Sequence, residues 1–247
     1  MSEHIIKTVL GIFLDLFKEK ITASDFYLLY EYILKISPAL LRGTKVTAEL
    51  FGLTLLFSLP LGLPFALGSI SRIPPVRWFC KTYIWVFRGT PLLLQLFFFY
   101  YFLPIQFGIM WTGFVTAVVT FSLNYAAYFA EIYRAGIQSI DRGQQEAAKS
   151  LGISKTRTMF GIIIPQTVKR VIPPISNETI TLVKDTALVY GIGVGELMRA
   201  ARGAVNRDVN VTAFTAAAVI YLVFTFVLTV ISQYLEKRFS RHLIKDD

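Results

Sequence analysis

The sequence predicts an all-α membrane protein, a polytopic bundle of about five transmembrane helices in one domain. Of the 247 residues, 54% are hydrophobic and 17% are charged, whereas soluble domains average about 45–50% apolar and about 25% charged residues. A helix needs about 20 apolar residues to cross a bilayer. Three uncharged runs reach that length, over 50–71, 89–130 and 209–235, with 22, 42 and 27 residues.

We expect the first 43 residues to form an N-terminal interfacial segment. Residues 5–17 place most of their apolar side chains along one helical stripe, but they are too short and too charged to cross. Residues 26–41 predict a second interfacial helix, and a crossing by this helix is the alternative. The transmembrane domain then covers 44–238, and its first span runs over 46–69.

The four remaining spans follow from the other apolar stretches. The 42-residue run is too long for one crossing, and Pro104 and Gly108 are turn formers, so it divides at 103–108 into spans over 83–103 and 111–137. The fourth span, 171–195, carries charged residues, and Pro173 and Pro174 are expected to break the helix at its start. The fifth span is 211–235, and residues 239–247 form a tail.

The distribution of Lys and Arg fixes the predicted orientation. Residues 72–88, 141–170 and the stretch after 236 hold fourteen basic residues, whereas the loops 104–110 and 196–210 hold three. Cytoplasmic loops are the ones enriched in Lys and Arg, so the N-terminus is expected outside and the C-terminus in the cytoplasm. Six basic residues in 1–45 run against this assignment.

Composition also excludes several kinds of site. The chain has one cysteine, Cys80, and its two histidines, His4 and His242, lie at opposite ends, so neither a thiolate metal site nor Cys/His catalysis is expected. The basic residues flank apolar spans, which argues for topology and against nucleic acid as a partner. No secretory signal peptide is recognisable at the N-terminus.

The expected cytoplasmic loop, 138–170, contains a short helix of its own. Asp141 with Gln144 three residues later has the form of an N-cap and its capping-box partner. Gly152 is placed to end this helix in a left-handed conformation, and Ser154 to cap the next one. The helix is centred on Ala147 and has no bulky side chain there to keep another surface away.

This loop resembles the EAA loop of ABC importer permeases, in which the corresponding helix inserts into a groove on a separate ATP-hydrolysing subunit. The matching positions are Glu146, Ala147, Ala148 and Gly152, followed by Ile162, Ile164 and Pro165. Ile164 is a departure, because the family more often has Leu there. The resemblance implies that Glu146, Ala147, Ala148 and Gly152 couple the chain to the ATPase.

Further segments narrow the resemblance to permeases for polar amino acids, the group of histidine, glutamine and arginine importers. These segments are 87–92, 124–128 with 131 and 134–136, and 184–186, with Ala187 where Ser is usual. The resemblance covers about 43–235. It implies a bacterial cytoplasmic membrane protein in which two such chains, identical or paralogous, assemble with two ATPase subunits and receive substrate from an extracytoplasmic solute-binding protein.

The chain itself is not expected to be an enzyme or to bind a cofactor. It contains no G-x-x-x-x-G-K-[ST] loop, so ATP would be bound by the partner subunit. A membrane-embedded hydrolase with Glu178 and Asp185 as a carboxylate pair is a remote alternative without a supporting motif. The main alternative is a secondary transporter driven by an ion gradient, with Glu131 and Asp185 as proton carriers.

Polar side chains at membrane depth are the candidate substrate contacts, because they are costly unless they face a cavity or another helix. The predicted set is Asp185, Asn124, Gln95, Thr186 and Glu131. A zwitterionic substrate needs a carboxylate for its ammonium group and donors for its carboxylate, which this set supplies. The alternative is that these side chains only bind helices together. The sequence does not distinguish one amino acid from another, nor a homodimer from a heterodimer.

Overall fold

The structure is a computed structural model that describes residues 23–240, and side-chain environments from 27 to 239. The helix expected over 5–17 and most of the expected tail lie outside the described residues. Within them the chain is helical and has no strand, in agreement with the predicted class. The elements are α2 (Ala23–Ser69), α3 (Pro74–Gly89), α4 (Leu92–Phe97), η1 (Phe98–Phe102), α5 (Leu103–Phe107), α6 (Gly113–Gln138), α7 (Arg142–Ser150), α8 (Lys155–Thr158), η2 (Met159–Ile163), α9 (Ile164–Asp185), η3 (Thr186–Ile192), α10 (Leu197–Asp208) and α11 (Thr212–Ser240).

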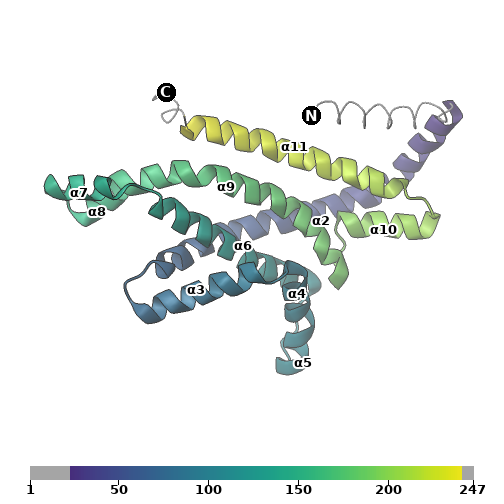
Figure 1. Cartoon of the computed structure of the whole chain (residues 1–247). Coiled ribbons are helices and arrows are strands. Elements are labelled where there is room, and N and C mark those ends of the chain that lie inside the picture. The colour runs from purple at the N-terminus through teal and green to yellow at the C-terminus, as the bar shows by residue number, and fades with distance from the viewer. Residues whose placement is uncertain (1–22, 241–247) are drawn as a thin grey trace, which may run out of the picture.

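Helix α2 differs from the sequence prediction, because the interfacial helix and the first span are one uninterrupted helix of 47 residues. The boundary that we placed at residue 43 therefore falls inside a helix. Gly43 does not end it because α10 packs directly there, and a Cβ on Gly43 would lie 2.8 Å from Leu197 Cα. At about 1.5 Å per residue the helix is about 70 Å long, more than twice the hydrocarbon thickness. Figure 1 shows that it bends near its N-terminal end.

The second expected span, 83–103, is also different in the structure. The helical chain breaks at Gly89–Pro91, where the helix Leu92–Phe107 bends by 105° from the direction of the helix Pro74–Gly89. Thr90 precedes a proline, which disfavours helical backbone, and its φ and ψ are −120° and 145°. The expected interruption at 103–108 is instead the short helix α5, which Gly108 ends with a φ of 67°.

The remaining helices follow the predicted order more closely. Helix α6 nearly coincides with the third expected span, 111–137, and α11 begins one residue after the start of the fifth. Helix α9 starts earlier than expected and runs through Pro173 and Pro174 without a break, contrary to our expectation. The fourth expected span is therefore the end of α9 followed by the 3₁₀ segment η3 and the start of the next turn.

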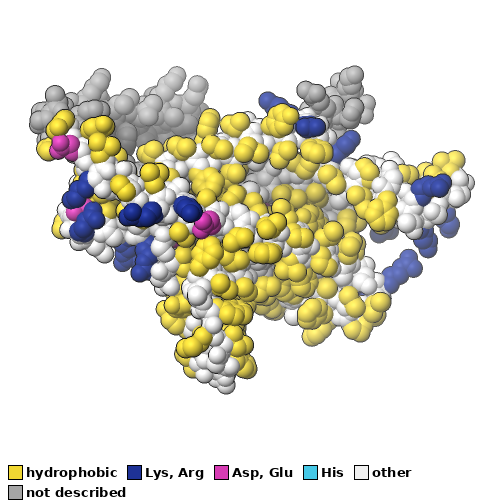
Figure 2. All heavy atoms as spheres, turned by 180° about the vertical axis from the view of Figure 1, so that it is seen from behind, with side chains coloured by type: hydrophobic (Ala, Val, Ile, Leu, Met, Phe, Trp, Pro, Cys, Tyr) yellow, Lys and Arg dark blue, Asp and Glu magenta, His cyan; other side chains and the backbone are white. Residues whose placement is uncertain are grey.

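Three of the described helices are long and apolar enough to cross a membrane, and the bent α3–α5 pair is a fourth candidate. Helices α2 and α6 pack along each other through the centre of the molecule, and α9 and α11 lie side by side (Figure 1). The main core joins α2, α4, α6, α9 and η3 around Phe121, Tyr125 and Leu182. Figure 2 shows a broad hydrophobic surface with Lys and Arg gathered toward the two ends of the molecule.

Candidate functional site

A cavity of about 350 Å³ lies where the α3–α4 break faces α6 and the end of α9. Two of the predicted residues, Asn124 and Asp185, line it together, and Gln95, Thr186 and Glu131 do not. The full lining is Arg88, Gly89, Thr90, Pro91, Leu92, Asn124, Tyr125, Tyr128, Glu178, Thr181 and Asp185. The cavity thus combines one guanidinium with two carboxylates at the edge of a broken helix.

The acidic side of the cavity is built by the C-terminal half of α9. Glu178 and Asp185 are seven residues apart and so lie on one helical face. The Tyr125 hydroxyl, from α6, donates a hydrogen bond of 2.7 Å to Asp185 Oδ2. Lys184, next to Asp185 in the sequence, is exposed and does not line the cavity. The Asp185 carboxylate is therefore held in place by the neighbouring helix.

Arg88 provides the basic side of the cavity. Its guanidinium lies over the Tyr128 ring, 5.5 Å from the centroid, and its Nη1 is 3.7 Å from Glu131 Oε1. Glu131 accepts a shorter hydrogen bond of 2.8 Å from Arg134 Nε on the same helix. The Glu131 charge is thus largely matched by Arg134, and Arg88 keeps an exposed side chain at the cavity.

Gln95 lies directly behind Asn124, away from the cavity lining. Asn124 Nδ2 donates to Gln95 Oε1 at 2.9 Å and to the Phe87 carbonyl at 3.1 Å. Both N–H groups of the Asn124 amide are therefore used within the protein, and its Oδ1 is the atom left to accept a bond from a ligand.

Thr186 is fully buried at the start of η3, where its hydroxyl donates to the Val183 carbonyl at 2.6 Å. A threonine that bonds to the carbonyl three residues earlier satisfies its own helix turn. The structure thus separates the five predicted residues into two that line the cavity and three that lie outside its lining.

Sequence reasoning selected only Asn124 and Asp185 of this lining as substrate contacts. The polar side chains that it did not select are those of Arg88, Thr90, Tyr125, Tyr128, Glu178 and Thr181. From the sequence, Arg88 with Pro91 has two interpretations, a hinge or a basic anchor at the cytoplasmic end of a span, and the anchor was preferred. Tyr125 and Tyr128 sit within an apolar run, where tyrosine is common. The one available signal was the proximity of Tyr125 to Asn124 and the 87–92 segment in the family resemblance.

The loop over 138–170 forms the short helix that its sequence predicts. Asp141 caps α7 by accepting a 2.8 Å bond from the Gly143 N–H, and the hydrogen bonds described for the loop include none from the Gln144 side chain back to Asp141. Gly152 has a φ of 71°, and the N–H groups of Ile153 and Gly152 donate to the Ala148 and Lys149 carbonyls. This pair of bonds is the Schellman arrangement that ends a helix.

The α7 side chains that the resemblance assigns to ATPase coupling are mostly exposed. Glu146 and Ala147 are on the outer surface, whereas Ala148 is 2% exposed and packs inward. Ser154 caps α8 through the Arg157 N–H, as predicted. The loop therefore presents a small helix, capped at both ends, at one end of the molecule, next to α8 (Figure 1).

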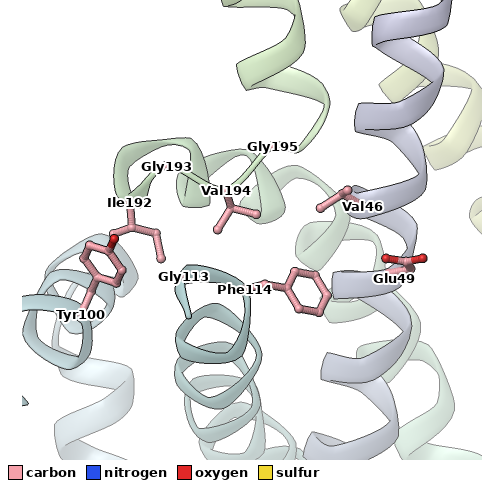
Figure 3. A pocket seen from close by; sticks show the side chains of 9 residues that line it. All are labelled: Val46, Glu49, Tyr100, Gly113, Phe114, Ile192, Gly193, Val194 and Gly195. Atoms are coloured by element: carbon pink, nitrogen blue, oxygen red, sulfur yellow. The ribbon is translucent and has the colours of Figure 1, made fainter. Parts of the chain in front are cut away.

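A second cavity, of about 440 Å³, lies near the start of α6. Figure 3 shows the loop Ile192–Gly195 crossing the start of α6 at Gly113, with Tyr100 on one side and Val46 and Glu49 of α2 on the other. Its one carboxylate is that of Glu49, whose Oε1 lies 3.8 Å from Lys45 Nζ. It contains none of the predicted residues, so the first cavity is the candidate substrate site.

Solved structures with the same arrangement of helices are membrane transporters. A crystal structure of an amino acid ABC transporter with histidines matches with a TM-score of 0.79 and 37% identity, over 83% of this chain and 96% of that chain. The methionine ABC transporter MetNI, in inward-facing conformations, matches with a TM-score of 0.62 and 16% identity over 89% and 99%. The second likeness concerns the fold alone.

Sequence comparisons identify the family. A model of the binding-protein-dependent transport system inner membrane component matches residues 58–241. The L-cystine transport system permease protein TcyB of Bacillus subtilis is 40% identical over 84% of this chain and 89% of its own length. The arginine transport system permease protein ArtQ of the same organism is 41% identical over 81% and 92%.

The chain belongs to the family of binding-protein-dependent transport system inner membrane components. It is a permease subunit of the ABC importer type, and its relatives are permeases of amino acid transport systems. This confirms the resemblance drawn from the EAA-like loop. Permeases of this family work with an ATPase and a substrate-binding protein, and the permease chain does not itself hydrolyse ATP.

Proposed function

We propose that this chain imports a polar amino acid through the cavity of Arg88, Asn124 and Asp185. The observation that carries the proposal is the pairing of opposite charges around one cavity. Arg88 offers planar N–H donors that suit an α-carboxylate, and Asp185 and Glu178 offer acceptors for an ammonium group. The Asn124 Oδ1 and the Thr181 hydroxyl add neutral hydrogen-bonding capacity for the rest of the substrate.

In this proposal, the energy for transport comes from ATP hydrolysis by a separate ATPase subunit that binds the α7 helix. Glu146, Ala147, Ala148 and Gly152 form the contact in this proposal, and two permease chains stand beside two ATPase subunits and one solute-binding protein. ATP binding would move α7, and with it α6 and α9, which α7 and α8 join. Because these two helices carry Asn124 and Asp185, their motion would shift the cavity between outward and inward access.

Transport in reconstituted vesicles tests the proposal. The permease is assembled with its cognate ATPase and solute-binding protein, and uptake of a panel of radiolabelled amino acids is measured with and without ATP. We expect ATP-dependent uptake that persists when a protonophore collapses the proton gradient. Uptake that survives ATP depletion but collapses with the gradient would favour the ion-driven transporter instead.

The role of the cavity is tested by Asp185→Asn in the same vesicles. The change keeps the side chain's shape and removes its charge, so one charge-assisted hydrogen bond to the substrate is lost. Uptake should fall about 10- to 100-fold, the effect of such a bond. Glu31→Gln, at an exposed carboxylate of α2 away from the cavity, is the matched control and should transport normally. Equal uptake by both variants would refute the assigned site.

A further inference from the structure

The break between α3 and α4 leaves backbone carbonyls without their helical donors. In a continuous helix the Phe87 carbonyl would accept from the N–H of residue 91, but residue 91 is proline and has none. The Thr90 carbonyl also lies at the break, beyond the end of α3. At membrane depth there is little water to replace a missing donor, so an unpaired carbonyl here would be costly.

Two side-chain amides supply the missing donors. Gln95 Nε2 lies 2.9 Å from the Phe87 carbonyl, 3.1 Å from the Thr90 carbonyl and 2.7 Å from Thr90 Oγ1. Asn124 Nδ2 also donates to the Phe87 carbonyl, and its second N–H binds Gln95 Oε1. Gln95 is 8% exposed and Asn124 3% exposed, so the pair stands in for a proline's absent N–H inside the bundle.

The same break determines where Arg88 stands. Arg88 is the penultimate residue of α3, one position after the carbonyl that both amides bind. Asn124 directly precedes Tyr125, which holds Asp185. The amide pair therefore joins the basic side of the cavity to the helix that fixes its acidic side.

We propose that Gln95 and Asn124 are positioning residues that hold the α3–α4 break at its angle and so direct Arg88 into the cavity. Gln95 then does not contact the substrate, because its N–H groups and its carbonyl oxygen are all committed to the protein. The role of Gln95 and Asn124 in transport rests on the proposed function, whereas their effect on the angle between α3 and α4 does not. The two parts can therefore be tested separately.

The angle is measured by electron–electron double resonance between spin labels on α3 and α5. Trp78 and Ile105 are 71% and 83% exposed, so Trp78→Cys and Ile105→Cys accept labels without disturbing the core, in a Cys80→Ala background. A straight helix would separate the two positions by about 40 Å, and the 105° bend brings them to about 25 Å. In a permease–ATPase complex in nanodiscs, with the doubly labelled chain diluted by unlabelled permease, we expect one narrow distance within the chain.

Gln95→Met keeps the length of the side chain and removes every donor. We expect its distance distribution to broaden toward longer values, and uptake to fall about tenfold, the effect of losing a buried hydrogen bond, with unchanged basal ATP hydrolysis. Gln106→Met, at an exposed glutamine of α5, is the matched control and should change neither. The exchange Gln95→Asn with Asn124→Gln preserves the combined length of the two side chains and should restore the narrow distance distribution that Gln95→Asn alone broadens.

A normal distance distribution in Gln95→Met with impaired uptake would overturn the proposal, because Gln95 would then act on the substrate directly. A normal distribution with normal uptake would overturn it as well. If Gln95→Met does not assemble, Gln95→Asn decides, since its shorter side chain cannot reach the Phe87 and Thr90 carbonyls from the same position. The proposal expects Gln95→Asn to lengthen the distance, and an unchanged distance would contradict it. None of the distance measurements depends on an amino acid being transported.

Discussion

The α7 loop and the substrate cavity differ in how the chain encodes them. The loop is determined within fifteen residues by Asp141, Gly152 and Ser154, each of which acts on backbone groups at most three residues away. The cavity combines α3, α6 and α9, and its hydrogen bond between Tyr125 and Asp185 joins residues 60 positions apart. One region can be read along the sequence, and the other requires the tertiary fold.

This difference also separates how the two regions respond to substitution. The loop depends on a backbone conformation that few residues adopt, so one change at Gly152 should affect the whole contact. The cavity depends on several polar bonds, and each of them contributes only part of the binding energy. We therefore expect single changes in the loop to have larger effects than single hydrogen-bond deletions in the cavity.

Gly152→Trp gives the largest expected effect. The φ of 71° at Gly152 disfavours any side chain at this position, and a bulky group would also keep the ATPase surface away. Strain and overpacking together amount to about 3 kcal/mol, or about a hundredfold weaker binding of the ATPase subunit. Co-purification and titration of the ATPase onto the permease in nanodiscs measure this effect. Gly161→Trp, at a glycine with open space around it, is the control, and equal binding by both variants would remove α7 from the interface.

Tyr125→Phe should have an intermediate effect on the cavity. It removes the bond to Asp185 but keeps the ring in the core, and hydrogen bonds to charged groups contribute about 1.5–3 kcal/mol. Because water in the cavity can partly replace the hydroxyl, we expect uptake to fall about tenfold or less. Tyr128→Phe keeps the ring under Arg88 and is the control. If Tyr128→Phe impaired uptake as much as Tyr125→Phe, the Asp185 contact would not be the reason.

The sequence predicted the elements that local chemistry decides. The caps of α7 and α8, the class of fold and the family were all accessible from residues close together in the chain. It missed the continuity of α2 through Gly43, because the helix there is maintained by close packing on α10. A hinge at Arg88 and Pro91 was one interpretation of the sequence, but a basic anchor on one straight span was preferred, because apolar residues continue on both sides of the proline. Without that break, Arg88 could not be placed at the cavity.

The contact between α2 and the end of α10 should give the smallest effect. Asp208 pairs with Arg207 and with Lys35 Nζ, the latter at 3.0 Å. The hydrogen bond from Arg207 and, to a smaller extent, the one from Lys35 lower the pKa of the Asp208 carboxyl below its ordinary value. Because the partners Lys35 and Arg207 are exposed to solvent, Asp208→Asn should lower the melting temperature of the complex by about 2 °C or less.

The pH dependence of that difference tests the lowered pKa. A carboxyl with a lowered pKa contributes its stability at every pH above its unfolded value of about 3.9, and loses it only as the pH falls further. The melting temperatures of the wild type and Asp208→Asn should therefore differ by the same amount from pH 8 to pH 5. Lys35→Met provides the matching change on α2 and should give a similar, equally constant difference. A difference that disappeared between pH 7 and pH 5 would show that Asp208 titrates there and that these hydrogen bonds do not hold it ionised.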